Sequence, residues 1–404
     1  MKRPVRLTLV AGAAALILVP ASLSACSVGQ PAATNAPPSS PGRALGSAGS
    51  SGVVTPSGGG TSTVPSLSAT PPSRLAVTTH WEATHTAGWV DASTVGAGKL
   101  WIGYALAGGR TPQMHGEVVG YDLTTGRPEV TMQVGAFPQA IAATSEGVWV
   151  ANEVGDLTQP GSPYLDTVQQ FTTMGTLVAT TRVPYPAAIT AAGTNAWVYY
   201  QPQGESGQAH VRLITPTHGN TLPAETDTPI PGVGAAGQIG FASLLVHCAG
   251  KLYAASNDAS ITHVILTEIT SQATTLATEA SASTKPSLGC TPAGSPVMML
   301  PGKHLAVVTK ATDYRPAPVN STDFFAYGAV GGPHLWIADD VPSTHTLTIS
   351  TVNDRGTTTS KPLTSTEPGN PLLAADSSGL WEIQPSQSAS NDTTIRVEHL
   401  TTTN

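Results

Sequence analysis

The chain has 404 residues, of which 11% are charged, and its formal net charge is −7. Because a nucleic-acid partner requires a basic face, this balance excludes nucleic acid, and it also argues against peripheral binding to anionic lipid. The low charge and the 41 glycines favour strands and turns over helices.

The first 25 residues have the pattern of an export signal. Three basic residues precede a short apolar run, residues 7–19, which is too short to span a membrane as a helix. The tetrapeptide Leu23-Ser24-Ala25-Cys26 follows and resembles the lipobox of bacterial lipoproteins. The resemblance implies cleavage after Ala25, a lipid on Cys26, and a protein anchored in the cell membrane on its extracytoplasmic face. The alternative is an ordinary signal peptide with a cysteine there by chance.

Residues 26–73 are predicted to be a lipidated cysteine followed by a disordered tether. Residues 27–73 are mostly Ser, Gly, Pro, Thr and Ala, with no aromatic and no acidic residue. Such a segment cannot bury enough apolar surface to offset its ordering entropy. As a flexible coil it would span about 35–40 Å. The alternative is a disordered remnant whose length has no role.

Residues 74–404 contain one recurring pattern: a short apolar stretch, a turn of about four small or polar residues, and an apolar strand centred on Trp. The clearest copies are residues 140–150, 188–198 and 372–382. Looser copies end at Leu100-Trp101, Leu252-Tyr253, Leu305-Ala306 and Leu335-Trp336, which makes seven. Two more strand-like runs usually follow each copy. The repeat therefore predicts an all-β chain, a seven-bladed β-propeller with four-stranded blades.

The spacing of the copies bears on the number of blades. Successive anchor residues lie 48, 48, 56, 53, 30 and 45 residues apart. The short step, from Ala306 to Trp336, leaves six blades as the alternative to seven. The last copy supplies only three strands, so residues 75–81 are predicted to pair with residues 394–400 and close the ring. The anchor tryptophans are predicted to pack between neighbouring sheets; the alternative is an aromatic platform for a ligand.

The repeat resembles the blades of bacterial propeller lipoproteins and of the streptogramin-lyase-like and YVTN-like propellers. There, too, a turn that often contains Gly precedes a strand with Leu or Val before Trp. Glu146-Gly147-Val148-Trp149 and Ser378-Gly379-Leu380-Trp381 carry this resemblance. It implies the fold, whereas propellers host unrelated activities. Streptogramin-lyase-type enzymes use a metal-assisted set of paired His and Glu, and no His-x-His or Glu-x-His pair here matches it.

Two cysteines remain after Cys26. In an exported domain, Cys248 and Cys290 are predicted to form one disulfide. It would close a loop of about 40 residues and contribute about 3–4 kcal/mol in the loop-entropy model. The alternative is two buried free thiols. A disulfide would also remove Cys248 as a metal ligand beside His247.

The binding face is predicted where the second-to-third strand loops and the blade connections emerge, because those loops are long and polar. The alternative for any single residue there is a solvated loop without function. The candidate residues are Arg110, His115, Asn152, Glu153, Asp156, Tyr164, Tyr185, Glu205, Asp258, Tyr314, Arg315, Asp339 and Asp340.

Catalytic signatures are weak. The sequence shows no nucleophile elbow, phosphate loop or calcium loop, so we predict no catalytic residue, no metal and no cofactor. Glu398 and His399 are adjacent in a strand and should point to opposite faces. The predicted function is a binding or scaffold module for an envelope protein, peptide or glycan. The alternatives are a lyase- or hydrolase-like enzyme with a central site, and a purely structural domain.

Overall fold

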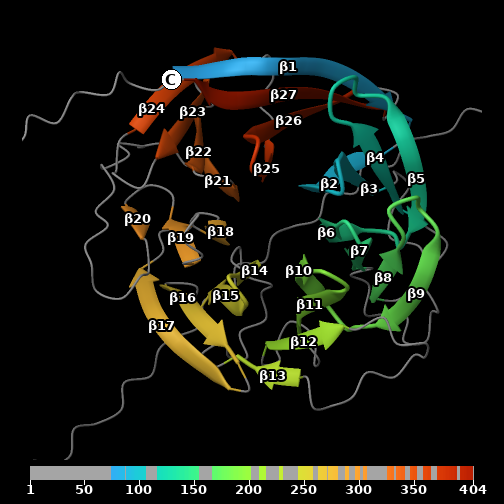
Figure 1. Ribbon diagram of the computed structural model, residues 1–404, viewed down its shortest axis with the longest axis vertical. Helices are drawn as coiled ribbons and strands as arrows, with labels where there is room; N and C mark the ends of the chain where they lie inside the picture. The colour runs from blue at the N-terminus through green and yellow to red at the C-terminus, as the bar shows by residue number, and fades with distance from the viewer. Residues whose placement is uncertain are drawn as a thin grey trace, which may run out of the picture. The chain divides into compact units, whose positions relative to one another are not determined.

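In the computed structural model of this chain, strands make up the regular structure of the described residues (Figure 1). It describes residues 74–86, 88–105, 116–153, 166–201, 209–214, 227–230, 244–257, 263–270, 272–280, 287–290, 296–300, 304–306, 325–331, 334–341, 346–352, 358–364, 371–388 and 392–403. They all belong to one unit, Ser68–Asn404. Within them the chain is all-β, as predicted, and no helix is long and apolar enough to cross a membrane. The predicted signal, the tether and Cys26 lie outside the described residues.

After the first described strand, the chain forms four antiparallel sheets in succession, and each contains four consecutive strands. The first contains β2 (Trp89–Gly96), β3 (Lys99–Ala105), β4 (Gly116–Asp122) and β5 (Pro128–Val134). The second contains β6 (Pro138–Thr144), β7 (Gly147–Asn152), β8 (Thr167–Phe171) and β9 (Leu177–Arg182). The third contains β10 (Pro186–Ala192), β11 (Asn195–Tyr200), β12 (His210–Ile214) and β13 (Asp227–Pro229). The fourth contains β14 (Leu244–Cys248), β15 (Lys251–Asn257), β16 (His263–Ile269) and β17 (Ala273–Ala280).

Three further sheets follow. Three strands are described in the next one, β18 (Ser287–Cys290), β19 (Pro296–Leu300) and β20 (His304–Ala306). Then come β21 (Phe325–Gly331), β22 (His334–Val341), β23 (Thr346–Val352) and β24 (Thr358–Thr364). The last, called the terminal sheet below, has the order β1-β27-β26-β25 and combines β1 (Arg74–His85) with β25 (Leu372–Ala375), β26 (Leu380–Gln387) and β27 (Thr393–Thr403).

The predicted pairing of the first and last strands is present. β1 lies antiparallel to β27, with Leu75 opposite Thr402 and Trp81 opposite Val397 (Figure 1). The first strand of each sheet contacts the first strand of the next, from β2 through β6, β10, β14, β18 and β21 to β25, and β25 also contacts β2. Repeated sheets joined in this way are the blades of a β-propeller.

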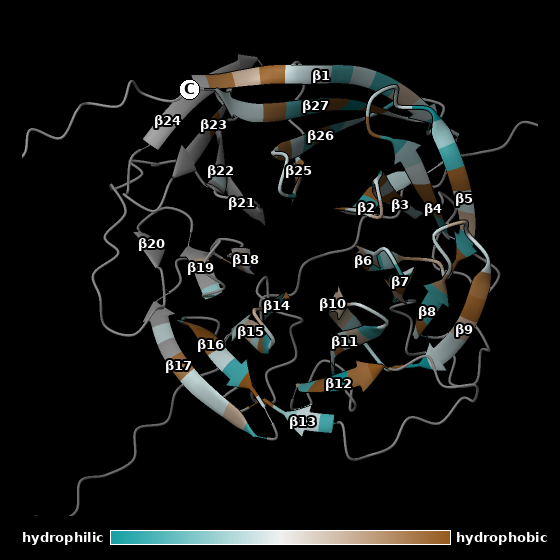
Figure 2. Ribbon diagram, in the orientation of Figure 1, coloured by the Kyte–Doolittle hydropathy of each residue, from teal (hydrophilic) through white to brown (hydrophobic). Residues whose placement is uncertain are grey.

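Exposed and buried residues alternate along the strands, and the buried apolar side chains form the core between sheets. In β5, for example, Val130, Met132 and Val134 are buried while the residues between them are exposed, and Figure 2 shows the same mixture of brown and teal along the outer strands. A period of two is what a pleated strand requires when its two faces have different surroundings.

The anchor tryptophans lie on the second strand of their sheets and are mostly core residues, as predicted. Trp101 and Trp149 are each 0% exposed, Trp336 is 1% exposed and Trp381 is 3% exposed. Each belongs to an apolar cluster that contains residues of two neighbouring sheets. Trp197 is only partly buried at the edge of such a cluster. The rings therefore fill the space between sheets.

The anchor predicted at Leu305-Ala306 is wrong. Those residues lie in β20, the third strand of their sheet, and the second strand is β19, which carries the fully buried Met298. Met298 packs in one cluster with Tyr253 of the preceding sheet. Counted from Met298, the step to Trp336 is 38 residues, whereas counting from Ala306, one strand too late, gives 30. A methionine fills the same inter-sheet space without the aromatic signal that marks the other copies.

The predicted disulfide between Cys248 and Cys290 is confirmed, with the two Cα atoms 5.6 Å apart. Cys248 ends β14 and Cys290 ends β18. The bond therefore links the first strands of two neighbouring sheets, across a sequence separation of 42 residues.

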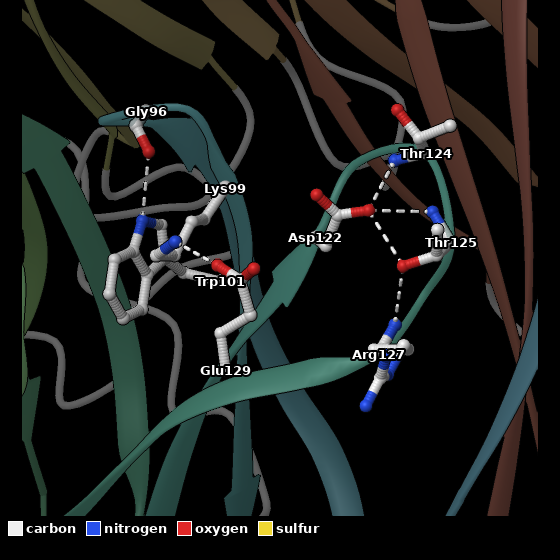
Figure 3. Close-up of polar contacts among 8 residues, drawn as sticks. All are labelled: Gly96, Lys99, Trp101, Asp122, Thr124, Thr125, Arg127 and Glu129. Atoms are coloured by element: carbon white, nitrogen blue, oxygen red, sulfur yellow. Dashed lines mark hydrogen bonds and ion pairs between the residues drawn. The ribbon is translucent and has the colours of Figure 1, made fainter.

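Tight turns close one end of the strands. In the β4–β5 turn, Asp122 Oδ1 accepts hydrogen bonds from the backbone N–H groups of Thr124 (3.2 Å) and Thr125 (2.8 Å) and from the Thr125 hydroxyl (2.7 Å) (Figure 3). The bond from the Thr125 hydroxyl is the main cause that lowers the pKa of Asp122. At the β2–β3 turn, the indole N–H of Trp101 donates to the Gly96 carbonyl (2.9 Å). These local bonds fix the conformation of the two turns.

Candidate functional site

The other end of the strands carries the longer connections. In the β2–β5 sheet, Ala105 pairs with Trp89 and Gly116 pairs with Val134, so the β3–β4 and β5–β6 connections leave the same end. The registers of the next two sheets place their equivalent connections in the same way. We call this the loop-bearing end. It is the end on which the sequence predicted ligand binding.

A β-bulge recurs near the loop-bearing end in three consecutive first strands. The register shifts between Val90 and Ala92 in β2, between Pro138 and Ala140 in β6, and between Pro186 and Ala188 in β10. The extra residues are Asp91, Gln139 and Ala187. A bulge takes its extra residue out of the regular alternation and redirects its side chain. Asp91, the only acid among these three residues, therefore lies outside the alternation of buried and exposed side chains along β2.

Asp91 is a carboxylate whose hydrogen bonding is incomplete. Burial raises its pKa to about 6, and a side-chain hydrogen bond with Trp89 opposes the shift. Its Oδ2 atom is buried and has no hydrogen-bond partner. Among the described residues, no cation forms an ion pair with it. A buried polar atom without a partner is rare enough in a native structure to require an explanation.

Trp89 presents aromatic surface beside Asp91. Its side chain is 37% exposed, the most exposed of the chain's described tryptophans. One side lies against Phe137, with ring centroids 5.8 Å apart and planes tilted by 37°. Phe137 is itself buried in a small cluster with Ala105 and Ala136. The indole therefore rests on a buried aromatic ring and keeps part of its surface exposed to solvent.

Two residues predicted for the binding face lie next to Phe137. The backbone N–H of Glu153 donates to the Phe137 carbonyl at 2.9 Å. Asn152 is 0% exposed, and its Nδ2 donates to Gln169 Oε1 at 2.9 Å. The same Gln169 oxygen accepts the N–H of Gly135 at 3.1 Å. Glu153 therefore belongs to the candidate site, whereas Asn152 braces the β5–β6 connection from inside.

Tyr185 lies in the β9–β10 connection and is 6% exposed, with a left-handed backbone, φ 48°. Its N–H donates to Asp166 Oδ2 at 3.0 Å, which fixes the connection. Asp339 and Asp340 were expected in a loop, but they lie within β22 and pair with β21 and β23, because the strand continues to Val341. The other predicted residues, Arg110, His115, Asp156, Tyr164, Glu205, Asp258, Tyr314 and Arg315, lie outside the described residues.

A second polar cluster at the loop-bearing end joins β1 to the β2–β5 sheet. His85 Nε2 lies 2.9 Å from Glu117 Oε2, and Gln133 Nε2 donates to Glu117 Oε1 at 2.6 Å. The His85 ring stacks on Tyr104 at 3.9 Å, and the hydroxyls of Tyr104 and Tyr121 are 2.7 Å apart. Burial is the main cause that raises the pKa of both tyrosines. Both oxygens of Glu117 are bonded, so this cluster fastens two sheets together.

A serine and a histidine meet at the tight-turn end, in the terminal sheet. Ser378 Oγ lies 3.2 Å from His399 Nε2 and 2.5 Å from Asp376 Oδ1. The Ser378 hydroxyl donates its one proton to Asp376, so that proton is not directed to His399. A base that activates a nucleophile would have to accept that proton. The Thr78 hydroxyl lies 2.9 Å from His399 Nδ1 and donates to the His399 backbone carbonyl at 3.3 Å.

Two glutamates face each other on the other side of the terminal sheet. Glu382 in β26 pairs directly with Glu398 in β27, and the Oε2 atom of each is buried without a hydrogen-bond partner. Burial is the main cause that raises the pKa of Glu382 to about 7, and Glu398 adds to it. His399 lies on the opposite face, stacked on Trp381 at 4.1 Å. The predicted separation of Glu398 and His399 is therefore confirmed.

Metal ligands do not gather in the part of the chain that is described: no group of three or more His, Cys, Asp or Glu there could hold a metal ion. The residues of the candidate site that sequence reasoning missed are Trp89, Asp91 and Phe137. One signal was present, because Trp89 is a tryptophan outside the repeat position. The bulge that redirects Asp91 has no signature in the sequence.

No protein-family model and no curated protein matches the sequence. Solved structures that resemble the chain include the β-propeller domain of Cps50 (Swd1) from Myceliophteria thermophila, with 13% identity over 82% of this chain and 100% of that chain and a TM-score of 0.49. The WD40 domain of coronin from Toxoplasma gondii matches 80% of this chain and 87% of its own, with 9% identity and a TM-score of 0.46. Apo AztD from Citrobacter koseri matches 69% of this chain and 72% of its own, with 13% identity and a TM-score of 0.40.

Proposed function

We propose that this chain is an exported, lipid-anchored protein whose propeller binds an envelope protein, peptide or glycan at its loop-bearing end. The observation that carries the proposal is the exposed indole of Trp89 beside the incompletely bonded carboxylate of Asp91, on the first strand of a sheet. An aromatic surface with a few fixed polar groups is typical of binding sites on rigid scaffolds.

The proposal includes a closed ring of seven blades. Its support is that the first strands contact one another in turn from β2 to β25, that β25 contacts β2, and that β1 pairs with β27. In such a ring the first strands surround the centre, and their loop-bearing ends surround one opening. Trp89 and Asp91 of β2 would then stand at that opening, next to Gln139 of β6.

The proposal also includes the lipid anchor on Cys26 and the tether of residues 26–73, which rest on the sequence pattern alone. Several acyl chains would hold the protein stably at the membrane, whereas one chain would bind only marginally. Replacing Cys26 by Ala is expected to release the protein into the medium or leave it unprocessed. Unchanged detergent-dependent retention in the membrane fraction would contradict the anchor.

We prefer binding to the lyase- or hydrolase-like alternative because the serine hydroxyl nearest to a histidine donates its hydrogen bond to a different residue. Ser378 and His399 come nearest to a nucleophile and its base within the described residues, yet the serine hydroxyl donates to Asp376. The group at the loop-bearing end, in contrast, combines exposed aromatic surface with an unbonded carboxylate oxygen and lacks a neighbouring nucleophile among the residues described.

The binding end can be tested by site-specific photo-crosslinking in the producing cell. A photoreactive residue at Glu153, beside Phe137, is expected to capture an envelope component, and Trp89→Ala is expected to abolish that capture. The matched control is the same photoreactive residue at Glu146, an exposed acid in the β6–β7 turn at the opposite end of the sheet. Equal capture from both positions, or capture from Glu153 that survives Trp89→Ala, would reject this choice of end.

A further inference from the structure

We infer that the loop-bearing end of β2 binds a cationic side chain, Lys or Arg, of a peptide or protein, between the Trp89 indole and the Asp91 carboxylate. This inference rests on the proposed binding function and names the class of its ligand. It selects a polypeptide from the protein, peptide and glycan alternatives.

The first support is that the Asp91 carboxylate lacks a hydrogen-bond partner at one oxygen and a neighbouring cation among the described residues. Asp91 Oδ2 is buried without a hydrogen-bond partner, and the carboxylate has no cation beside it among the described residues. The raised pKa of Asp91 expresses the same imbalance, since burial disfavours its charged form. An ammonium or guanidinium group beside the partly buried Asp91 side chain would supply the opposite charge. A neutral sugar hydroxyl would leave the charge uncompensated.

The second support is the aromatic ring beside that carboxylate. A cation is attracted to the face of an indole, the strongest of the aromatic side chains in this respect. Trp89 is partly exposed, is supported by Phe137 at 5.8 Å, and lies two residues from Asp91 on the same strand. The support from Phe137 limits the motion of the ring before any ligand arrives, which lowers the entropy lost on binding.

The third support is the charge of the surroundings. All 25 Asp and Glu residues lie in residues 74–404, whereas four of the 18 Lys and Arg residues precede residue 74. The folded region is therefore more acidic than the whole chain. Glu153 lies at the same end, with its backbone bonded to Phe137. A net negative charge on the protein accelerates the approach of cations and disfavours acidic ligands.

The test measures peptide binding to the full-length lipidated protein in detergent micelles by isothermal titration calorimetry. The probes are hexalysine, hexalysine acetylated on every side chain, and chitohexaose as a neutral glycan. Hexalysine is expected to bind, and the other two probes are not. Asp91→Asn is expected to weaken hexalysine binding about tenfold, and Trp89→Ala to weaken it more than Trp89→Phe does.

The matched control is Glu146→Gln, which removes one exposed acid at the opposite end of a sheet and should change the affinity by less than about twofold. Because Asp91→Asn removes an unpaired buried charge, it should melt no earlier than the parent protein, which keeps a loss of binding interpretable. Equal weakening by Asp91→Asn and Glu146→Gln would show general electrostatic attraction and overturn the inference.

Other outcomes separate this inference from the proposed function. Tight binding of the acetylated peptide would overturn the cation site. Binding of chitohexaose that depends on Trp89 but survives Asp91→Asn would overturn it in favour of a glycan site, and the proposed binding function would stand. If none of the probes binds while Glu153 still captures a component in a Trp89-dependent manner, the cationic ligand fails and the binding function remains.

Discussion

Tryptophans at the same position of successive sheets do not have the same surroundings. Trp149 is fully buried between two sheets, whereas Trp197 is partly buried and stacks on His247 of the next sheet, with ring centroids 5.0 Å apart. Trp149→Ala is therefore expected to cost about 3–5 kcal/mol of the free energy of unfolding, and Trp197→Ala about 1–3 kcal/mol. Urea unfolding followed by circular dichroism measures both. Equal losses would contradict the difference in packing.

Two turn glycines with similar backbone angles predict different effects of the same substitution. Gly126 (φ 67°) and Gly98 (φ 72°) both have the left-handed conformation. A Cβ on Gly98 would meet nothing within 4 Å, whereas a Cβ on Gly126 would overlap the ring of Trp81. Gly98→Ala is expected to cost about 1–2 kcal/mol from backbone strain alone. Gly126→Ala should cost about 2 kcal/mol more, because the buried Trp81 ring must move.

Thermal unfolding of the two glycine variants provides the comparison, with Gly98→Ala as the control for backbone strain. Equal shifts of Tm would mean that the Trp81 ring can move away from the new Cβ without a loss of stability. The result concerns the terminal sheet as well, since Trp81 is a residue of β1.

The candidate site shows where residue-level prediction from sequence stops. Asn152 and Glu153 were predicted at the loop-bearing end because they begin a long polar loop between the second and third strands, and both lie at that end. Asp91 was missed because Trp89-Val90-Asp91 reads as ordinary alternation in a strand. Its special position depends on a register shift against β3, which only the pairing of two strands defines.

At the scale of elements, the cross-strand pair Glu382–Glu398 predicts that the stability of the terminal sheet depends on pH. The folded-state pKa of Glu382, about 7, is above its usual value of 4.5, so the folded chain retains a proton that the unfolded chain releases between those values. Stability is therefore expected to fall as pH rises from about 4.5 to 7, by about 3 kcal/mol at most. Glu382→Gln should flatten this slope, because the amide does not ionise.

The measurement is the free energy of unfolding in urea at pH 5, 6, 7 and 8. The control is Glu82→Gln, which removes an exposed acid of β1 in the same sheet. Gln384 and Arg396, which bond Glu382 and Glu398 respectively, stay unchanged in both variants. A slope that is the same in the parent chain and in Glu382→Gln would show that another group titrates.

The elements themselves were largely predictable, because a buried strand followed by a tight turn repeats in the sequence. The failure at Ala306 has a physical cause: Met298 occupies the inter-sheet position, and a flexible thioether satisfies that space without the Trp that marked other copies. The end of β22 was misjudged for a related reason. Asp339 and Asp340 read as loop residues, yet a strand tolerates acids where its neighbours supply the backbone pairing.

At the scale of the whole molecule, β1 is expected to be indispensable although it precedes every other described strand. It pairs with β27 along its length, and its Trp81 is 6% exposed in the core between the terminal sheet and the β2–β5 sheet. Deleting residues 74–85 would leave β27 as an open edge and remove that ring. We expect loss of cooperative thermal unfolding and of solubility.

The control for this truncation is a deletion of residues 30–70, within the predicted tether, which should leave Tm unchanged. Calorimetry and size-exclusion chromatography of both proteins check the comparison. A shortened chain without residues 74–85 that still melts cooperatively at the parent temperature would show that the terminal sheet is stable with three strands.

Arg74 stands opposite Thr403, so β1 pairs with the described strand that lies farthest from it along the sequence. A chain leaves the ribosome amino end first, and sheets such as β2–β5 can pair from neighbouring residues as they emerge. Residues 74–85 must instead remain without their strand partner until residues 393–403 have been synthesised. During that interval β1 is an open edge, with which the edge strands of other nascent chains can pair in place of β27.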